Sequence, residues 1–301
     1  MKKLIFITNN SLKLGKQVAQ KANLLIGRAN ILKSAEGEIL VRLKESVRGK
    51  EVYVLGSTFP PAENLLEFLI LINTLKINKP KKIIAIVSYY GYAKADRTDR
   101  PGWSVTARLA AQFIETAGAN EFIGITLHSE RIEKFFKIPT HHLDAISLLA
   151  GYFKSFNKKD LAIASPDFGG IKRAKNFAKI LGINNIVVVE KKRPTEKVAV
   201  ISKITGDFKN KNIILVDDMI QSGNTIIENV KILKAQGAKK IYVTAAHITY
   251  SGNPIEKLKK ANIKEIIITD TIAPPNNLPK KFKIISTAKL ISDYLINKIS
   301  L

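Results

Sequence analysis

The segment 213–225 holds the residues with the clearest chemical role, because an apolar run ends there in two carboxylates, Asp217 and Asp218. A short turn with serine and glycine follows, and the apolar spacing predicts a helix over 226–235. At the carboxyl end of a buried parallel strand, acids face the crevice where open α/β sheets bind ligands, and the N–H groups of the turn and helix start hold an anion. Acids beside an anion cradle suit a sugar phosphate, whose hydroxyls or metal would meet the carboxylates. The alternative is an Asp-Asp turn that only caps the helix.

Length and composition indicate the kind of chain that must position these groups. A chain of 301 residues predicts about two domains, and 46% hydrophobic with 25% charged residues is ordinary globular composition. The absence of cysteine excludes disulfides and thiol chemistry and fits a reducing compartment. The apolar run at residues 4–7 is too short for a signal peptide and predicts a first strand, and no run reaches the roughly 18 apolar residues that cross a bilayer. We expect a soluble, cytoplasmic protein with no membrane partner.

The net charge of +24 raises the alternative of a nucleic-acid partner. Only nine of the 49 basic residues are arginine, and the lysines are spread along the whole chain. The sequence shows neither an aromatic base-stacking pattern nor zinc-ligand spacing. A lysine-rich composition with solvated faces therefore explains the charge better, and no nucleic acid is expected as a partner.

The chain repeats itself at an offset of 119 residues. Each copy has a threonine at a helix start, a glycine at its end and a histidine after the next strand: Thr106, Gly118 and His128, then Thr225, Gly237 and His247. Alternating strands and helices predict mainly parallel sheets flanked by helices. We therefore expect two duplicated α/β domains, 1–147 and 148–301, joined near residues 145–160, with the Asp217-Asp218 loop in the second.

Further motifs follow one another along nearly the whole length. They are Glu45-Ser46-Val47-Arg48-Gly49-Lys50, Tyr89-Tyr90-Gly91-Tyr92-Ala93, Leu127-His128-Ser129-Glu130, Phe135-Phe136-Lys137-Ile138-Pro139, Ser165-Pro166-Asp167-Phe168-Gly169-Gly170, Lys191-Lys192-Arg193-Pro194, Ser251-Gly252-Asn253 and Thr269-Asp270-Thr271. In this order and spacing, together with the Asp217-Asp218 loop, they resemble the ribose-phosphate pyrophosphokinase (phosphoribosyl pyrophosphate synthetase) family. The resemblance implies two phosphoribosyltransferase-like domains and a role in nucleotide biosynthesis. It also implies transfer of the diphosphoryl group of ATP to the C1 hydroxyl of ribose 5-phosphate with Mg²⁺, in a homo-oligomer that is a dimer or a hexamer.

The resemblance also implies roles for individual residues. Catalytic cations over the transferred group would be Lys191 and Arg193, and metal-associated positions would be His128 and Asp167. Ribose 5-phosphate would be held by Asp217, Asp218 and Gln221 at the sugar and by Ser222, Gly223, Asn224 and Thr225 at the phosphate. Nucleotide-binding residues would be Glu36, Glu38, Lys94 and Asp96.

The sequence departs from the family mainly on the nucleotide side. Residues 33–38 read Lys-Ser-Ala-Glu-Gly-Glu, without the aromatic residue that stacks on adenine in the family, and such a stack contributes about 1–3 kcal/mol. The usual Arg-Gln pair is Lys94-Ala95, which removes a bidentate donor and an amide. The third acid of the ribose-phosphate loop is Gln221, which still hydrogen-bonds a hydroxyl.

The candidate catalytic, metal-associated and ribose-binding residues Lys191, Arg193, His128, Asp167, Asp217 and Asp218 are all kept. This favours an active or partly active enzyme, and the departures indicate relaxed or altered nucleotide recognition. The main alternative is a non-catalytic, regulatory member of the family that associates with an active synthetase. A phosphoribosyltransferase that consumes the diphosphate product is a third hypothesis, but the match over both domains argues against it. A basic nucleic-acid-binding module is the fourth, and no base-reading motif supports it.

Overall fold

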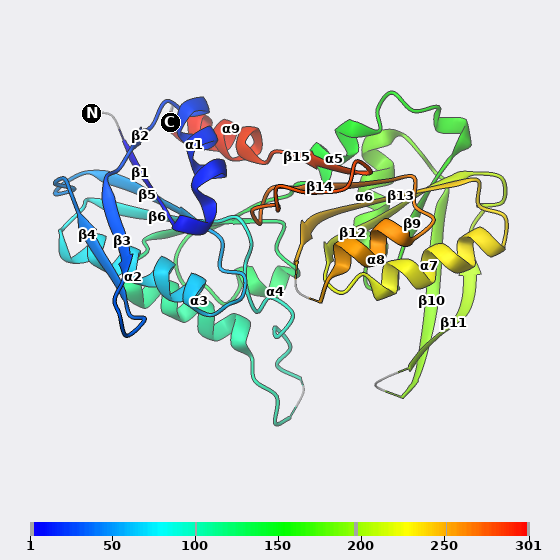
Figure 1. The fold of residues 1–301 in the computed structure, drawn as a ribbon, viewed down its shortest axis with the longest axis horizontal. Helices are drawn as coiled ribbons and strands as arrows, with labels where there is room; N and C mark the ends of the chain where they lie inside the picture. The colour runs from blue at the N-terminus through cyan, green and yellow to red at the C-terminus, as the bar shows by residue number, and fades with distance from the viewer. Residues whose placement is uncertain (1–2, 100, 196–197, 251, 300–301) are drawn as a thin grey trace. The chain divides into compact units, whose positions relative to one another are not determined.

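The computed structural model describes residues 3–99, 101–195, 198–250 and 252–299, without the side chains of residues 190–195, 198–203 and 299 (Figure 1). Two compact units divide the chain. The first comprises Met1–Asp144, Thr271–Ala273 and Ser286–Leu301, and the second comprises Ala145–Asp270 and Pro274–Ile285.

The last helix, α9 (Ala288–Ile299), therefore groups with the first unit, although it follows the second in sequence. It packs on α1 (Leu12–Lys21), and the Ser286 hydroxyl just before it donates to the side chain of Gln17 at 2.8 Å. The compact units differ in this respect from the continuous domains 1–147 and 148–301 that the repeat suggests, because packing of α9 on α1 joins segments far apart in sequence.

The first unit is built on a six-stranded sheet in the order β2-β1-β5-β6-β7-β8, with every neighbouring pair parallel. Its strands are β1 (Leu4–Ile7), β2 (Leu25–Ile26), β5 (Glu51–Gly56), β6 (Lys82–Val87), β7 (Glu121–Ile125) and β8 (Thr140–Leu143). A separate antiparallel hairpin pairs β3 (Ala29–Lys33) with β4 (Ile39–Leu43). The unit's other helices are η1 (Asn9–Ser11), α2 (Glu63–Ile77), α3 (Thr106–Ala117) and α4 (Glu130–Glu133).

Alternation along the strands supplies the core of this unit. Val52 and Val54 of β5 lie in one buried cluster with apolar residues of α2 and α3. Tyr53 and Leu55, which alternate with them along the strand, are buried outside that cluster. Successive side chains of a strand point to opposite faces, so both faces of the sheet are covered. This explains why the strands read as continuous apolar runs, as expected for buried parallel strands.

The second unit is built on a seven-stranded sheet in the order β11-β10-β9-β12-β13-β14-β15. Its strands are β9 (Leu161–Ser165), β10 (Ile186–Thr195), β11 (Val198–Thr205), β12 (Asn212–Ile220), β13 (Lys240–Ile248), β14 (Glu265–Thr269) and β15 (Phe282–Ile285). Its helices are α5 (Ile146–Tyr152), η2 (Lys158–Asp160), α6 (Ile171–Leu181), α7 (Asn224–Ala235) and α8 (Pro254–Lys260). The neighbouring strands are parallel except β10 and β11, which run antiparallel side by side at the edge (Figure 1).

The strand order places a ligand crevice in the second unit. From β9 the chain continues to β10 on one side, and it later returns to β12 on the other side. Ligands of open α/β sheets bind outside the carboxyl ends of the strands at such a switch in order. The predicted repeat is present around it, because α7 connects the adjacent parallel strands β12 and β13 as α3 connects β6 and β7. Both units are thus mainly parallel sheets flanked by helices, as predicted.

Among the described residues, no helix has both the length and the apolar character needed to span a bilayer.

Candidate active site

The acid pair lies at the carboxyl end of β12, at the switch in strand order. The sequence suggested that the strand ends before the acids, but β12 continues through both, and its pairing with β13 reaches Ile220. The strand is therefore longer than the apolar run indicates, because the parallel ladder with β13 extends past the carboxylates. The side chain of Asp217 is 19% exposed and that of Asp218 is 6% exposed.

Arg173 of α6 pairs with both acids. Its Nη1 atom lies 2.8 Å from Oδ1 of Asp217 and its Nη2 atom lies 3.2 Å from Oδ1 of Asp218. Oδ1 of Asp217 also accepts from the backbone N–H of Asp218 at 2.9 Å. Burial is the main cause that raises the pKa of Asp217 well above its usual range, the charge of Asp218 raises it further, and Arg173 opposes both. Arg173 was not predicted from the sequence. The one feature that could have indicated it is that an arginine, which is rare in this lysine-rich chain, lies close to the Asp167 motif.

The predicted phosphate turn follows β12 directly. Gly223 caps α7 with a φ of 75°, in the left-handed region that favours glycine. The side chains of Gln221, Ser222 and Asn224 are exposed beside it, as is that of Thr225. The first helical hydrogen bond runs from Ile227 N–H to the Gly223 carbonyl at 3.0 Å, and the N–H groups at a helix start have no partner within the helix. The turn therefore has exposed side chains and helix-start N–H groups next to the acid pair, and its role as an anion site stays a prediction.

Asp167 lies at the carboxyl end of β9, the strand next to β12. It is exposed, and its Oδ1 accepts from the N–H of Gly170 at 3.0 Å. The hydroxyl of Ser165 donates to the Asp167 carbonyl at 2.7 Å. The buried Asn229 of α7 donates to the Pro166 carbonyl at 3.1 Å. The turn that carries Asp167 is thus hydrogen-bonded to α7, the helix that follows the predicted phosphate turn.

His128 belongs to the first unit, in the turn after β7. Thr126 there has a φ of 42°, which is unusual for a β-branched residue and marks local strain. The N–H of Leu127 donates to Nε2 of His142 at 3.0 Å. His142 therefore holds the turn in which the half-buried His128 lies.

The predicted nucleotide residues of the first unit lie in two places. Asp96 is 3% exposed, and its Oδ2 accepts from the hydroxyl of Ser129 and from Nη1 of Arg131, the latter at 3.1 Å. These contacts make Asp96 a support for the turn after His128. Lys94 is exposed close by in sequence. Glu36 and Glu38 are exposed in the turn between β3 and β4, which is closed by a hydrogen bond between the residues at its two ends.

The predicted catalytic cations lie on β10. The backbone of Lys191 pairs with Ile201 of β11, whereas Arg193 lies where the register of the two strands shifts. Both side chains lie outside the described residues. Within the part of the chain that the structure describes, no group of three or more histidine, aspartate or glutamate side chains forms a metal site.

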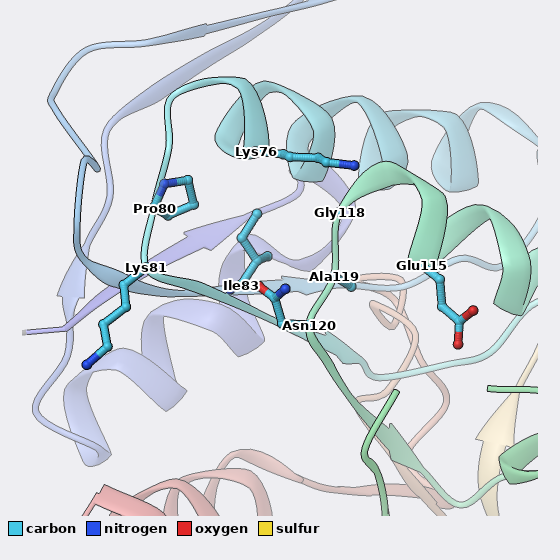
Figure 2. A pocket seen from close by; sticks show the side chains of 8 residues that line it. All are labelled: Lys76, Pro80, Lys81, Ile83, Glu115, Gly118, Ala119 and Asn120. Carbon is cyan, nitrogen blue, oxygen red and sulfur yellow. Dashed lines mark hydrogen bonds between the residues drawn. The ribbon is translucent and has the colours of Figure 1, made fainter. Parts of the chain in front are cut away.

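A pocket of about 250 Å³ opens at the other end of the first sheet (Figure 2). It is lined from the ends of α2 and α3 and from the starts of β6 and β7, by side chains that include Lys76, Glu115 and Asn120. None of the predicted site residues lines it. It lies at the amino ends of the strands, whereas ligands of this kind of sheet bind at the carboxyl ends.

A mainly parallel sheet with an acid pair on one strand, a glycine turn after that strand and a third acid just beyond the neighbouring strand is the arrangement of the phosphoribosyltransferase-like class. Comparison with known proteins specifies the class further. The family model for the N-terminal domain of ribose phosphate pyrophosphokinase matches residues 3–118, and the model for the phosphoribosyl synthetase-associated domain matches residues 172–299. The chain belongs to the ribose-phosphate pyrophosphokinase family.

Individual relatives agree over the whole length. The ribose-phosphate pyrophosphokinase of Fusobacterium nucleatum is 38% identical, with 96% of this chain and 92% of the relative covered. That of Bacillus subtilis is 35% identical, with 97% and 92% covered. The crystal structure of phosphoribosylpyrophosphate synthetase from Mycobacterium smegmatis superposes with a TM-score of 0.93 at 32% identity and covers 100% of this chain and 99% of that one. The resemblance, the fold class and the enzyme class, a diphosphotransferase, are confirmed. The roles of individual residues stay predictions.

Proposed function

We propose that this chain transfers the diphosphoryl group of ATP to the C1 hydroxyl of ribose 5-phosphate, which yields phosphoribosyl pyrophosphate and AMP. The observation that carries the proposal is the acid pair Asp217-Asp218 directly before the Gly223 turn, in a chain whose relatives bear the name of this activity. The carboxylates suit the ribose hydroxyls and the turn suits the 5-phosphate. The C1 hydroxyl oxygen attacks the β-phosphorus and loses its proton, and the bond from that phosphorus to the oxygen bridging the α- and β-phosphates breaks to release AMP.

Charge builds up on phosphoryl oxygens during this displacement, so the protein contributes mainly positioning and cationic stabilisation. We assign that stabilisation to Lys191 and Arg193 by the family resemblance. Arg193 offers a planar fork of donors, whereas Lys192 beside it offers a point charge.

Mg²⁺ is the metal we propose, with Asp167 and His128 as the associated residues. Asp167 fits because it is an exposed carboxylate at the switch in strand order, and Mg²⁺ in such enzymes is held by one or two carboxylates together with substrate phosphates. An imidazole nitrogen is a poor direct ligand for this hard cation, so His128 would be associated with the site without binding the ion directly. When bound, the ion neutralises phosphate oxygens of the nucleotide.

The regulatory alternative has a specific observation in its favour. The turn between β3 and β4 presents Glu36 and Glu38 to solvent without an aromatic side chain among residues 34–38. Lys94 replaces an arginine fork with one ammonium group. These features concern nucleotide recognition, whereas the ribose-phosphate loop keeps Asp217, Asp218, Ser222, Gly223 and Thr225 and departs at Gln221 and Asn224. For this reason we favour an enzyme with altered nucleotide preference.

The fate of labelled phosphorus tests the proposal. With ATP labelled at the β-phosphorus, diphosphoryl transfer moves the label into the sugar product, whereas a monophosphoryl kinase leaves it in ADP. The same reaction with GTP and CTP reports the nucleotide preference. Label that stays in the nucleotide under all conditions would contradict the proposal. We further expect the active form to act in the cytoplasm as a homo-oligomer, at least a dimer, and a purely monomeric species in sedimentation would contradict the oligomer.

A further inference from the structure

Arg173 occupies an unusual place for a cation. It is the third residue of α6, and the amino end of a helix carries partial positive charge, which disfavours a cation there. Its side chain is only 17% exposed. A buried cation in the first turn of a helix requires compensation from nearby anions, and the two carboxylates of β12 provide it.

The contact geometry fixes both carboxylates at once. Each terminal nitrogen of the guanidinium pairs with a different residue, Asp217 at 2.8 Å and Asp218 at 3.2 Å. Because the guanidinium is rigid and planar, the two carboxylates are held at a set separation. One positive charge against two negative charges leaves the group with a net charge of −1, so the acids keep anionic character toward a ligand.

The start of α6 also couples Arg173 to the turn of Asp167. A Cβ atom on Gly170 would lie 2.7 Å from the Ser165 hydroxyl oxygen and 3.5 Å from Nη1 of Arg173. The first contact is too short for a side chain at this position, whereas the second is an ordinary van der Waals contact. Gly170, whose N–H donates to Asp167, therefore lies directly beside the guanidinium of Arg173.

We propose that Arg173 is a positioning residue that holds Asp217 and Asp218 as an oriented, anionic pair, so that each receives one of two adjacent ribose hydroxyls. This inference rests on the proposed function. It makes a prediction about sugar specificity, because a ligand without the 2-hydroxyl would leave one fixed carboxylate without its ligand partner. Sites built to bond a hydroxyl reject analogues that lack it, so the wild-type protein should bind 2-deoxyribose 5-phosphate roughly 10- to 100-fold more weakly than ribose 5-phosphate.

Calorimetric titration of the full chain with ribose 5-phosphate and with 2-deoxyribose 5-phosphate tests this role. Arg173→Met should weaken ribose 5-phosphate binding at least about 10-fold and bring the affinity ratio of the two sugars close to one. Arg173→Lys keeps a cation without the planar fork and should give an intermediate ratio, and it also serves if the methionine variant does not fold. Lys175→Met, at an exposed position of the same helix, should leave both affinities unchanged.

Two outcomes separate this inference from the proposed function. Arg173→Met and Arg173→Lys could weaken the binding of both sugar phosphates by the same factor, or leave both affinities unchanged. In either case the affinity ratio is preserved, and the positioning role is wrong while the proposed function stands. If the wild-type protein binds neither sugar phosphate, the proposed function fails, and the inference fails with it. Binding with discrimination but without AMP formation contradicts only the proposed reaction.

Discussion

Asp217→Asn should affect stability and ligand binding in opposite directions. The carboxylate of Asp217 is largely buried beside that of Asp218, and burial and that neighbouring charge raise its pKa. The charge on Asp217 is therefore a cost to folding at neutral pH, and relief of such a functional charge typically stabilises by about 0.5–2 kcal/mol. The amide keeps an oxygen for Arg173, which retains its pairing with Asp218. For a unit of this size the gain corresponds to a rise in Tm of about 1–8 °C.

Ribose 5-phosphate binding should weaken in the same variant. A hydrogen bond to a charged group contributes about 1.5–3 kcal/mol, so the loss of the charge should raise Kd by roughly 10- to 150-fold. Titration calorimetry and thermal unfolding measure the two effects on one preparation. Asp207→Asn is the matched control, because that carboxylate is 72% exposed and 4.0 Å from its lysine partner, and exposed pairs contribute little.

The difference in stability between the wild type and Asp217→Asn should depend on pH, and this dependence tests whether the buried charge is its cause. A carboxyl group whose pKa is raised on folding binds more protons in the folded state, so wild-type stability falls as pH rises through the raised value. The advantage of Asp217→Asn should therefore vanish below pH 3.8, the ordinary aspartate value, and grow above it. The reasoning is refuted if the variant is less stable than the wild type at neutral pH and binds ribose 5-phosphate equally well.

Three further changes give distinct outcomes. Glu121→Gln removes a buried carboxylate that pairs with Lys82 at 2.7 Å, so calorimetry should show a loss of about 3 kcal/mol and a fall in Tm of about 6–12 °C; an unchanged Tm would contradict the importance of this pair. Gly223→Ala should lower the free energy of unfolding by about 1–2 kcal/mol, because the backbone there is left-handed, and it should weaken ribose 5-phosphate binding. Gly237→Ala, also at positive φ but outside the site, should lower stability alone. Equal effects of the two variants on binding would argue against the phosphate turn. Gln221→Asp should raise turnover or leave it unchanged if the amide substitutes for an acid, and a large fall would mean that the pocket is built around the amide.

The sequence was sufficient for the features that depend on local patterns. The apolar run at residues 4–7 forms β1 as predicted, and α3 begins at Thr106 as predicted. The Gly-Ala pair after α3 marks the end of that helix, because Gly118 adopts a φ of 126° that few other residues tolerate. Periodicity and glycine positions carry this information within one element.

Features that depend on contacts between distant segments were not predictable. Arg173 meets Asp217 across 44 residues of chain, and no period or motif marks that pairing. The continuation of β12 through Asp218 depends on its ladder with β13, which no property of the segment itself reveals. The return of the last helix to the first unit depends on contacts such as that of Lys298 with Glu121. In each case the deciding interaction comes from a partner that is remote in sequence.

The most direct measurement is a single reaction of purified protein with Mg²⁺, ATP and ribose 5-phosphate, in which AMP and phosphoribosyl pyrophosphate are quantified together. The proposed function predicts that both form in equal amounts and that neither forms without ribose 5-phosphate. Absence of AMP with every nucleotide tested, from folded protein that still binds ribose 5-phosphate, would contradict it and favour the regulatory member of the family.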